Sequence, residues 1–150
     1  NGPCFDVVDG QQRLTTIMLS LCAFRDLLKE KVLNSAQKNY LQTIENLLYN
    51  FYIESGETRV RLELQYEESY DYLTTLIQGQ SYDGTQSPSI SRMQDAYMKI
   101  RQHLRMYDDT DVLIDFIKYF LTRIELVVIE SQDLSSALKI FETINQRGVG

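Results

Sequence analysis

The stretch DVVDGQQRLTTIMLSL, residues 6–21, joins a short apolar run to a strongly amphipathic helix. An ordinary turn between a strand and a helix needs an acid and a glycine, which Asp9 and Gly10 supply. It does not need Gln11, Gln12 and Arg13 as well. These three polar side chains therefore need a chemical explanation.

Apolar residues recur at helical spacing over residues 12–32, and Asp9 is close enough to cap the start of this helix. Residues 5–8 are expected to form a strand before it. A single strand cannot satisfy its own backbone hydrogen bonds, so we expect further strands upstream. We interpret residues 1–150 as a single partial domain that lacks its upstream strands and its downstream continuation.

The rest of the chain is mostly helical by its apolar periodicity. Helices are expected over residues 36–52, 67–78, 91–107, 110–122 and 134–144. Strands are expected over residues 59–64, which alternate, and 124–131, which are rich in β-branched residues. Residues 79–89 have turn formers throughout, and Gly148 is expected to end the last helix. The predicted fold class is α+β and predominantly α-helical, a helical bundle with a short β element at each end.

Composition excludes several classes of protein. With 43% hydrophobic and 24% charged residues, the 150-residue chain is typical of a soluble globular domain with one core. No apolar stretch is long enough to cross a bilayer. Cys4 and Cys22 form neither a metal motif nor a disulfide framework, which favours a cytoplasmic location. A net charge of -6 excludes a general polyanion binder, so nucleic acid would have to be bound by a local patch or by other parts of a longer protein.

A helix N-terminus exposes unpaired N–H groups and a positive dipole end, so the DGQQR sequence could bind phosphate there. Gly10 lets a ligand approach the backbone, and Arg13 offers a planar fork for phosphate oxygens. Gln11 and Gln12 could orient a water or a sugar hydroxyl, while Asp9 could hold a metal, act as a base or cap the helix. Local chemistry alone favours the simpler interpretation of a capped turn with solvated helix-starting residues.

The second candidate is FETINQRGVG, residues 141–150, in which Asn145 and Arg147 flank a helix end. Spacing alone favours the simpler interpretation of a capped C-terminus with an exposed arginine. His103 has no second histidine for a metal or nuclease centre, and the acids of residues 108–111 read as a helix start. Arg101 and Arg105, four residues apart, give only a small basic face.

Taken together, VVDGQQRLTT (residues 7–16) and SSALKIFETINQRGV (residues 135–149) resemble the two most distinctive stretches of the GmrSD-type restriction endonuclease N-terminal domain family. The resemblance spans nearly the whole chain. It implies a ParB/sulfiredoxin-like fold and a role in prokaryotic defence against phage, particularly phage with modified DNA. It also implies that the DGQQR region binds and hydrolyses a nucleotide and communicates with a separate nuclease domain.

The resemblance implies an NTP substrate, Mg²⁺ as a candidate cofactor and no metal site of the protein's own. The implied partners are DNA, bound through other domains, and a nuclease domain in cis or in trans. Two alternatives are a non-enzymatic DNA- or nucleotide-sensing module and a helical protein-interaction domain. The implied catalytic residues are Asp9, Gln11, Gln12 and Arg13, and the implied phosphate-binding residues are Gly10, Arg13, Asn145, Arg147 and Gly148.

Overall fold

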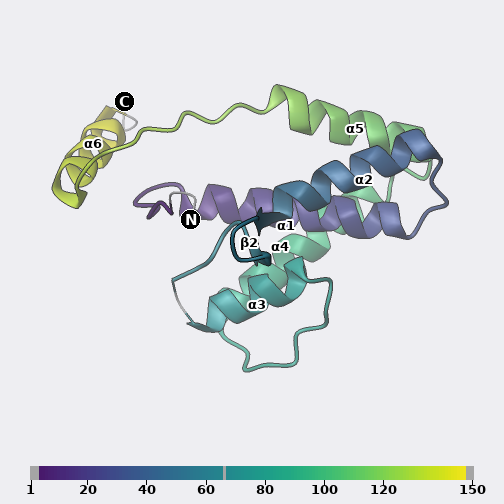
Figure 1. Ribbon diagram of the computed structural model, residues 1–150, viewed down its shortest axis with the longest axis horizontal. Helices are drawn as coiled ribbons and strands as arrows, with labels where there is room; N and C mark the ends of the chain where they lie inside the picture. The colour runs from purple at the N-terminus through teal and green to yellow at the C-terminus, as the bar shows by residue number, and fades with distance from the viewer. Residues whose placement is uncertain (1–3, 66, 148–150) are drawn as a thin grey trace.

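The structure, a computed structural model, describes residues 4–65 and 67–147. It is a bundle of helices with one small β-hairpin, and its last helix stands apart from the bundle (Figure 1). The predicted predominantly helical α+β fold is confirmed. The elements are α1 (Gln11–Lys29), α2 (Ser35–Leu48), β1 (Tyr49–Tyr52), β2 (Glu57–Val60), α3 (Glu67–Ile77), α4 (Pro88–Leu104), α5 (Thr110–Arg123) and α6 (Leu134–Arg147).

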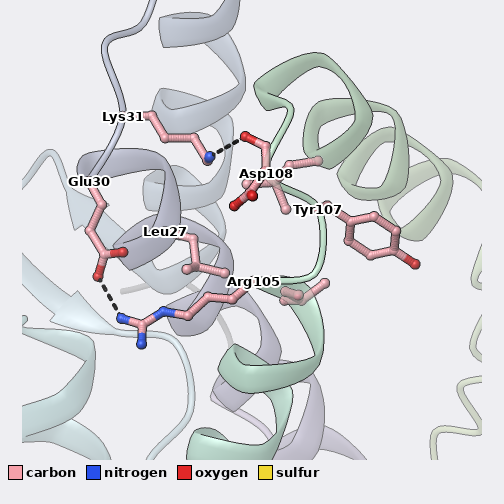
Figure 2. Close-up of a pocket in the computed structure, with 8 residues that line it drawn as sticks. Leu27, Glu30, Lys31, Arg105, Tyr107 and Asp108 are labelled. Atoms are coloured by element: carbon pink, nitrogen blue, oxygen red, sulfur yellow. Dashed lines mark hydrogen bonds and ion pairs between the residues drawn. The ribbon is translucent and has the colours of Figure 1, made fainter.

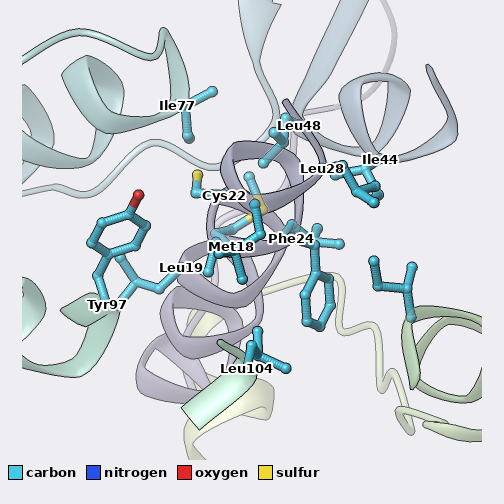
Figure 3. Close-up of a cluster of buried hydrophobic side chains, with 14 of the residues drawn as sticks. Met18, Leu19, Cys22, Phe24, Leu28, Ile44, Leu48, Ile77, Tyr97 and Leu104 are labelled. Carbon is cyan, nitrogen blue, oxygen red and sulfur yellow. The ribbon is translucent and has the colours of Figure 1, made fainter. Parts of the chain in front are cut away.

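Helix α1 is the centre of the core. Between Met18 and Leu28 nearly all of its side chains are buried, including Cys22 and Phe24. Figure 3 shows apolar side chains of α2, α3 and α4 gathered around this helix. A helix that is buried on nearly every side is stable only when other elements surround it, so α1 dictates where its neighbours pack. None of the described helices is long and apolar enough to cross a membrane.

Side-chain caps set the starts of several helices. Asn34 and Gln37 form a reciprocal capping box at α2, with distances of 2.9 and 3.0 Å between their side chains and the backbone nitrogens. Ser87 caps α4, which then begins at Pro88. Asp109 caps α5, which confirms that the acidic residues 108–111 are a helix start. These caps satisfy backbone N–H groups that the helices cannot pair themselves.

The β-hairpin lies between α2 and α3. Strands β1 and β2 are antiparallel, and their register runs from Tyr49 opposite Val60 to Tyr52 opposite Glu57. Gly56 supplies the left-handed turn residue, with φ of 69°. The predicted helix over residues 36–52 is therefore wrong in its last turn, because pairing with β2 draws that segment out of the helix.

Two predicted strands do not form within the described residues. Residues 5–8 and 124–131 run without strand pairing, and no described strand lies beside them to accept their hydrogen bonds. Phe5 is 63% exposed and Val127 is 91% exposed, so neither segment has a covered face. The expectation of a β element at each end of the bundle is wrong for the described residues, since a strand needs a neighbour.

Arg25 is a charged residue in the middle of the core, only 2% exposed. Its guanidinium donates to the carbonyls of Ile77 and of Leu76, the latter at 2.8 Å, and pairs with Asp26 at 2.8 Å. Burial by itself lowers the pKa of Arg25, but the hydrogen bond to Asp26 and the charge interactions with Cys22, Asp26 and Tyr49 together outweigh it and raise the pKa. Arg25 thus satisfies the last carbonyls of α3 and joins that helix to α1.

Replacing Arg25 by methionine should destabilise the protein by about 3 kcal/mol, because two helix-end carbonyls and the Asp26 carboxylate each lose one of their donors and the buried ion pair is broken. Urea unfolding measures the change. Arg92→Met, at an exposed position on α4, is the matched control and should change the free energy of unfolding by less than about 0.5 kcal/mol. Equal effects of the two substitutions would contradict the bridging role of Arg25.

The core should also be sensitive to alkali. Burial raises the pKa of Cys22 from 9.0 to about 12 and that of Tyr72 from 10.0 to about 12. Both groups stay protonated in the folded state while the unfolded chain loses its protons, so stability is full below pH 9.0 and falls as pH rises toward about 12. Urea unfolding across this range tests the effect. Cys22→Ala should remove the part of the stability loss that begins near pH 9.0. An unchanged dependence of stability on pH in this variant would contradict the role of Cys22.

Candidate functional site

The DGQQR sequence forms the turn into α1 and the first turn of that helix. Gln11, Gln12 and Arg13 are exposed, whereas burial of α1 begins at Met18. The first turns of α1 lie at one end of the bundle in Figure 1. The same helix therefore anchors the core with one part and offers its N-terminus to solvent with the other.

Gly10 has the left-handed backbone that the turn requires, with φ of 88° and ψ of 11°. Its carbonyl accepts the first helical hydrogen bond, from the N–H of Leu14 at 3.0 Å. The guanidinium of Arg13 lies alongside it, since a Cβ added at Gly10 would be 3.6 Å from both Nε and Nη2 of Arg13. Gly10 thus keeps the backbone bare directly beside a cationic group.

No side chain caps α1. The predicted capping role of Asp9 is wrong, because its carboxylate instead accepts a hydrogen bond from Nη2 of Arg13 at 3.2 Å. By contrast, side-chain oxygens cap α2, α4 and α5. The first N–H groups of α1 are left pointing at solvent, with the positive end of the helix dipole behind them.

The two glutamines of the sequence behave differently. Nε2 of Gln11 donates to the carbonyl of Val7 at 2.8 Å, which ties the entering loop to the helix. The side chain of Gln12 is exposed and makes no hydrogen bond to any residue that the structure describes. Gln12 is therefore free to contact a ligand, and Gln11 holds the loop that would face it.

The electrostatics of this end of α1 favour an anion. The first turn contains no acidic residue. Arg13 has 70% of its side chain exposed, and its partner Asp9 has 42% exposed, so their ion pair is screened and weak. A phosphate could displace the carboxylate from Arg13 at little cost. No cluster of three or more potential metal ligands occurs in the described part of the chain.

The second candidate stretch lies on α6. Asn145 and Arg147 are exposed near the end of this helix, and Gly148 lies outside the described residues. Asp133 caps the start of α6 by accepting from the N–H of Ser136 at 2.7 Å, and this hydrogen bond lowers the pKa of Asp133. No hydrogen bond or ion pair among the described residues joins α6 to the start of α1.

A cavity of about 280 Å³ lies at the opposite end of α1, beside the turn between α4 and α5 (Figure 2). Its rim is charged, but the cations are already engaged. Lys31 donates to the Asp108 carbonyl at 2.9 Å, and Arg105 pairs with Glu30 at 3.4 Å. Arg101 also pairs with Glu30, so the basic face expected for Arg101 and Arg105 is neutralised.

Sequence reasoning did not anticipate this role of Glu30, because its partners are more than 70 residues away along the chain. The buried position of Arg25 was detectable. It falls seven residues after Met18 and three before Leu28, on the apolar stripe of α1. A charged residue on such a stripe indicates a buried, hydrogen-bonded partner.

The remaining residues that the sequence singled out are structural. Asp109 caps α5, and Asp111 accepts a hydrogen bond from Gln37 at 2.9 Å. His103 is exposed on α4. These contacts hold helices in place and leave the start of α1 as the candidate site.

Comparison with known families agrees with the two sequence stretches. The family model described as GmrSD restriction endonuclease, N-terminal domain, matches residues 1–150. No curated protein and no solved structure matches the chain. Because the match covers the whole length, the chain belongs to the GmrSD restriction endonuclease N-terminal domain family.

Proposed function

We propose that this chain is the nucleotide-hydrolysing regulatory domain of a restriction protein that acts on modified phage DNA. One observation carries the proposal: α1 has no side-chain cap, and the Arg13 guanidinium lies beside Gly10 at that free N-terminus. Backbone N–H groups, a helix dipole and an exposed arginine at a bare glycine together form the kind of site that binds phosphate. Family membership supplies the restriction context.

The phosphates of an NTP would lie over residues 10–13. Free N–H groups of the first turn donate to the phosphate oxygens, and Arg13 exchanges its contact with Asp9 for one with the terminal phosphate. This exchange releases the Asp9 carboxylate next to the bound nucleotide. Because Arg13 is long and exposed, it can follow the charge that develops on the transferred phosphoryl group.

Once released, Asp9 would position the attacking water, with Gln12 as the second polar contact. Asp9 is a carboxylate of the kind that holds Mg²⁺ together with substrate phosphates, so the residues present fit a nucleotide-bound ion. Such an ion would neutralise phosphate charge. Gln11 acts on the loop through Val7 rather than on the water.

The other proposed partners follow from charge. The chain carries a net charge of -6, and Arg101 and Arg105 are paired with Glu30, so DNA would contact other domains of the full-length protein. A nuclease domain in cis or in trans would respond to nucleotide binding or hydrolysis at this domain. We propose a cytoplasmic location for the protein. Asn145, Arg147 and Gly148 stay proposed phosphate contacts, and a ParB/sulfiredoxin-like fold stays a proposal.

Arg13→Ala should lower phosphate release from NTPs by about 100-fold or more in the full-length protein, because the transition-state charge loses its cation. A phosphate-release assay over a panel of NTPs measures this. Arg13 and Asp9 form only an exposed ion pair, so folding by circular dichroism should be unchanged.

Arg59→Ala is the matched control for this variant. Arg59 is also exposed and paired with an acid, Glu57 at 2.6 Å, but it lies on the hairpin. Wild-type release that persists in Arg13→Ala would overturn the assignment. Nucleotide binding to the wild type without any release, with DNA present, would instead favour the sensing module that binds without turnover.

The two glutamines should separate kinetically. Gln12→Ala should lower kcat about 10-fold or more with little change in KM, since its free side chain would orient the water. Gln11→Ala should mainly raise KM, because the loop that carries Asp9 and Gly10 loses its hydrogen bond to the helix. Steady-state kinetics distinguish the two. A reversed pattern would assign the water contact to Gln11.

A further inference from the structure

We propose that two copies of this chain exchange their C-terminal arms, residues 124–147. The apolar face of α6 of one copy packs into an apolar groove formed by α1, α4 and α5 of the other copy. Two independent features of the chain lead to this inference: a helix face with nothing covering it, and a groove with nothing filling it.

The arm is apolar and uncovered. Val127 and Val128 are 91% and 77% exposed, and α6 has no buried residue. Along α6, apolar side chains recur at spacings of four, three and three residues, which places them on one face. This face is made of Leu134, Leu138, Phe141 and Ile144, all exposed. An exposed apolar helix face of this kind marks an interaction site.

The groove has a volume of about 440 Å³. Aromatic rings make much of its wall, since Phe24 meets Phe116 and Phe120 edge to face at centroid distances of 6.0 and 5.0 Å. Ile100 and Leu104 of α4 complete the apolar lining. Helices that recognise such grooves do so with side chains at this helical spacing.

Charge at the rim of the groove complements the arm. Lys99 and His103 line the groove from α4, and both are exposed. Glu142 follows Leu138 by four residues and so borders the apolar face of α6. Neither Lys99 nor Glu142 forms an ion pair among the described residues. Docking of α6 would bring these opposite charges together.

The occupant is a second copy because of how the arm leaves the bundle. Residues 124–130 contain no glycine, proline, asparagine, aspartate or serine that would turn the chain back. Extended over seven residues, they carry α6 roughly 23 Å away, and α6 stands apart from the bundle (Figure 1). Phe120 of the groove is nevertheless only one turn before the end of α5. Reciprocal exchange of such an arm closes a dimer with two-fold symmetry.

Site-specific cross-linking tests the exchange in the full-length protein. Lys99→Cys and Glu142→Cys are made in separate molecules on a Cys4→Ser background, mixed under mild oxidation, and the linked peptides are identified by mass spectrometry. We expect a disulfide between the two variants. Adding Leu138→Glu to the Glu142→Cys protein should lower the yield at least 10-fold, whereas Thr143→Glu, on the opposite face of α6, should not.

Val32→Cys in place of Lys99→Cys is the matched control, because Val32 is 99% exposed but lies outside the groove. Equal linking to Val32, or no linking to position 99, would overturn the proposal. A third protein carries Lys99→Cys and Glu142→Cys in the same chain. It detects an arm that folds back into the groove of its own chain. Linkage within single chains in that protein, without linkage in the mixture, would also overturn it.

Discussion

Helix α1 is covered on nearly every side between Met18 and Leu28, and the need to cover it places α2, α3 and α4 around it. Burial of apolar side chains supplies most of the stability of such a bundle. It also forces Arg25 into the core, where the charge is tolerated because α3 ends there and its carbonyls at Leu76 and Ile77 accept hydrogen bonds from the guanidinium. Helix α1 thus determines both the packing of the core and the position of the buried charge of Arg25 within it.

The same constraint explains why the candidate site is exposed. Burial starts at Met18, and Gln11, Gln12 and Arg13 in the first turn of α1 are exposed, so the turn at Gly10 stays accessible. Rigid burial of the remainder of α1 fixes the direction of these turns. A phosphate bound there would contact groups whose positions the core already determines, which lowers the entropic cost of binding.

Helices were predictable because apolar periodicity is local information, and all six described helices fall close to the expected ranges. Strands were predicted less well, because a strand exists only with its neighbour. The expected strand over residues 59–64 overlaps β2 (Glu57–Val60) only at residues 59 and 60. Residues 49–52 extend the apolar spacing of α2 but pair with β2. Residues 124–131 have the composition of a strand, yet no described strand pairs with them.

At the candidate site, residue types were predictable and their contacts were not. The sequence indicated a glycine, an arginine and an acid at a helix start. It could not show that Asp9 pairs with Arg13 instead of capping the helix, because both contacts satisfy the carboxylate at this spacing. Likewise, only the structure separates Gln11, which is bound to Val7, from Gln12, which is free.

Two surfaces lie outside the core and are uncovered: the start of α1 and the arm. Their chemistry differs. The start of α1 offers N–H groups and an exposed cation, so any anion bound there is weakened by salt. The arm offers apolar side chains, and salt does not weaken the burial of such side chains. The groove proposed for the arm includes Ser20, which is on α1 two turns after Arg13. A docked arm would therefore pack against the helix that carries the candidate nucleotide site, and this gives nucleotide binding and dimer formation one shared structural element.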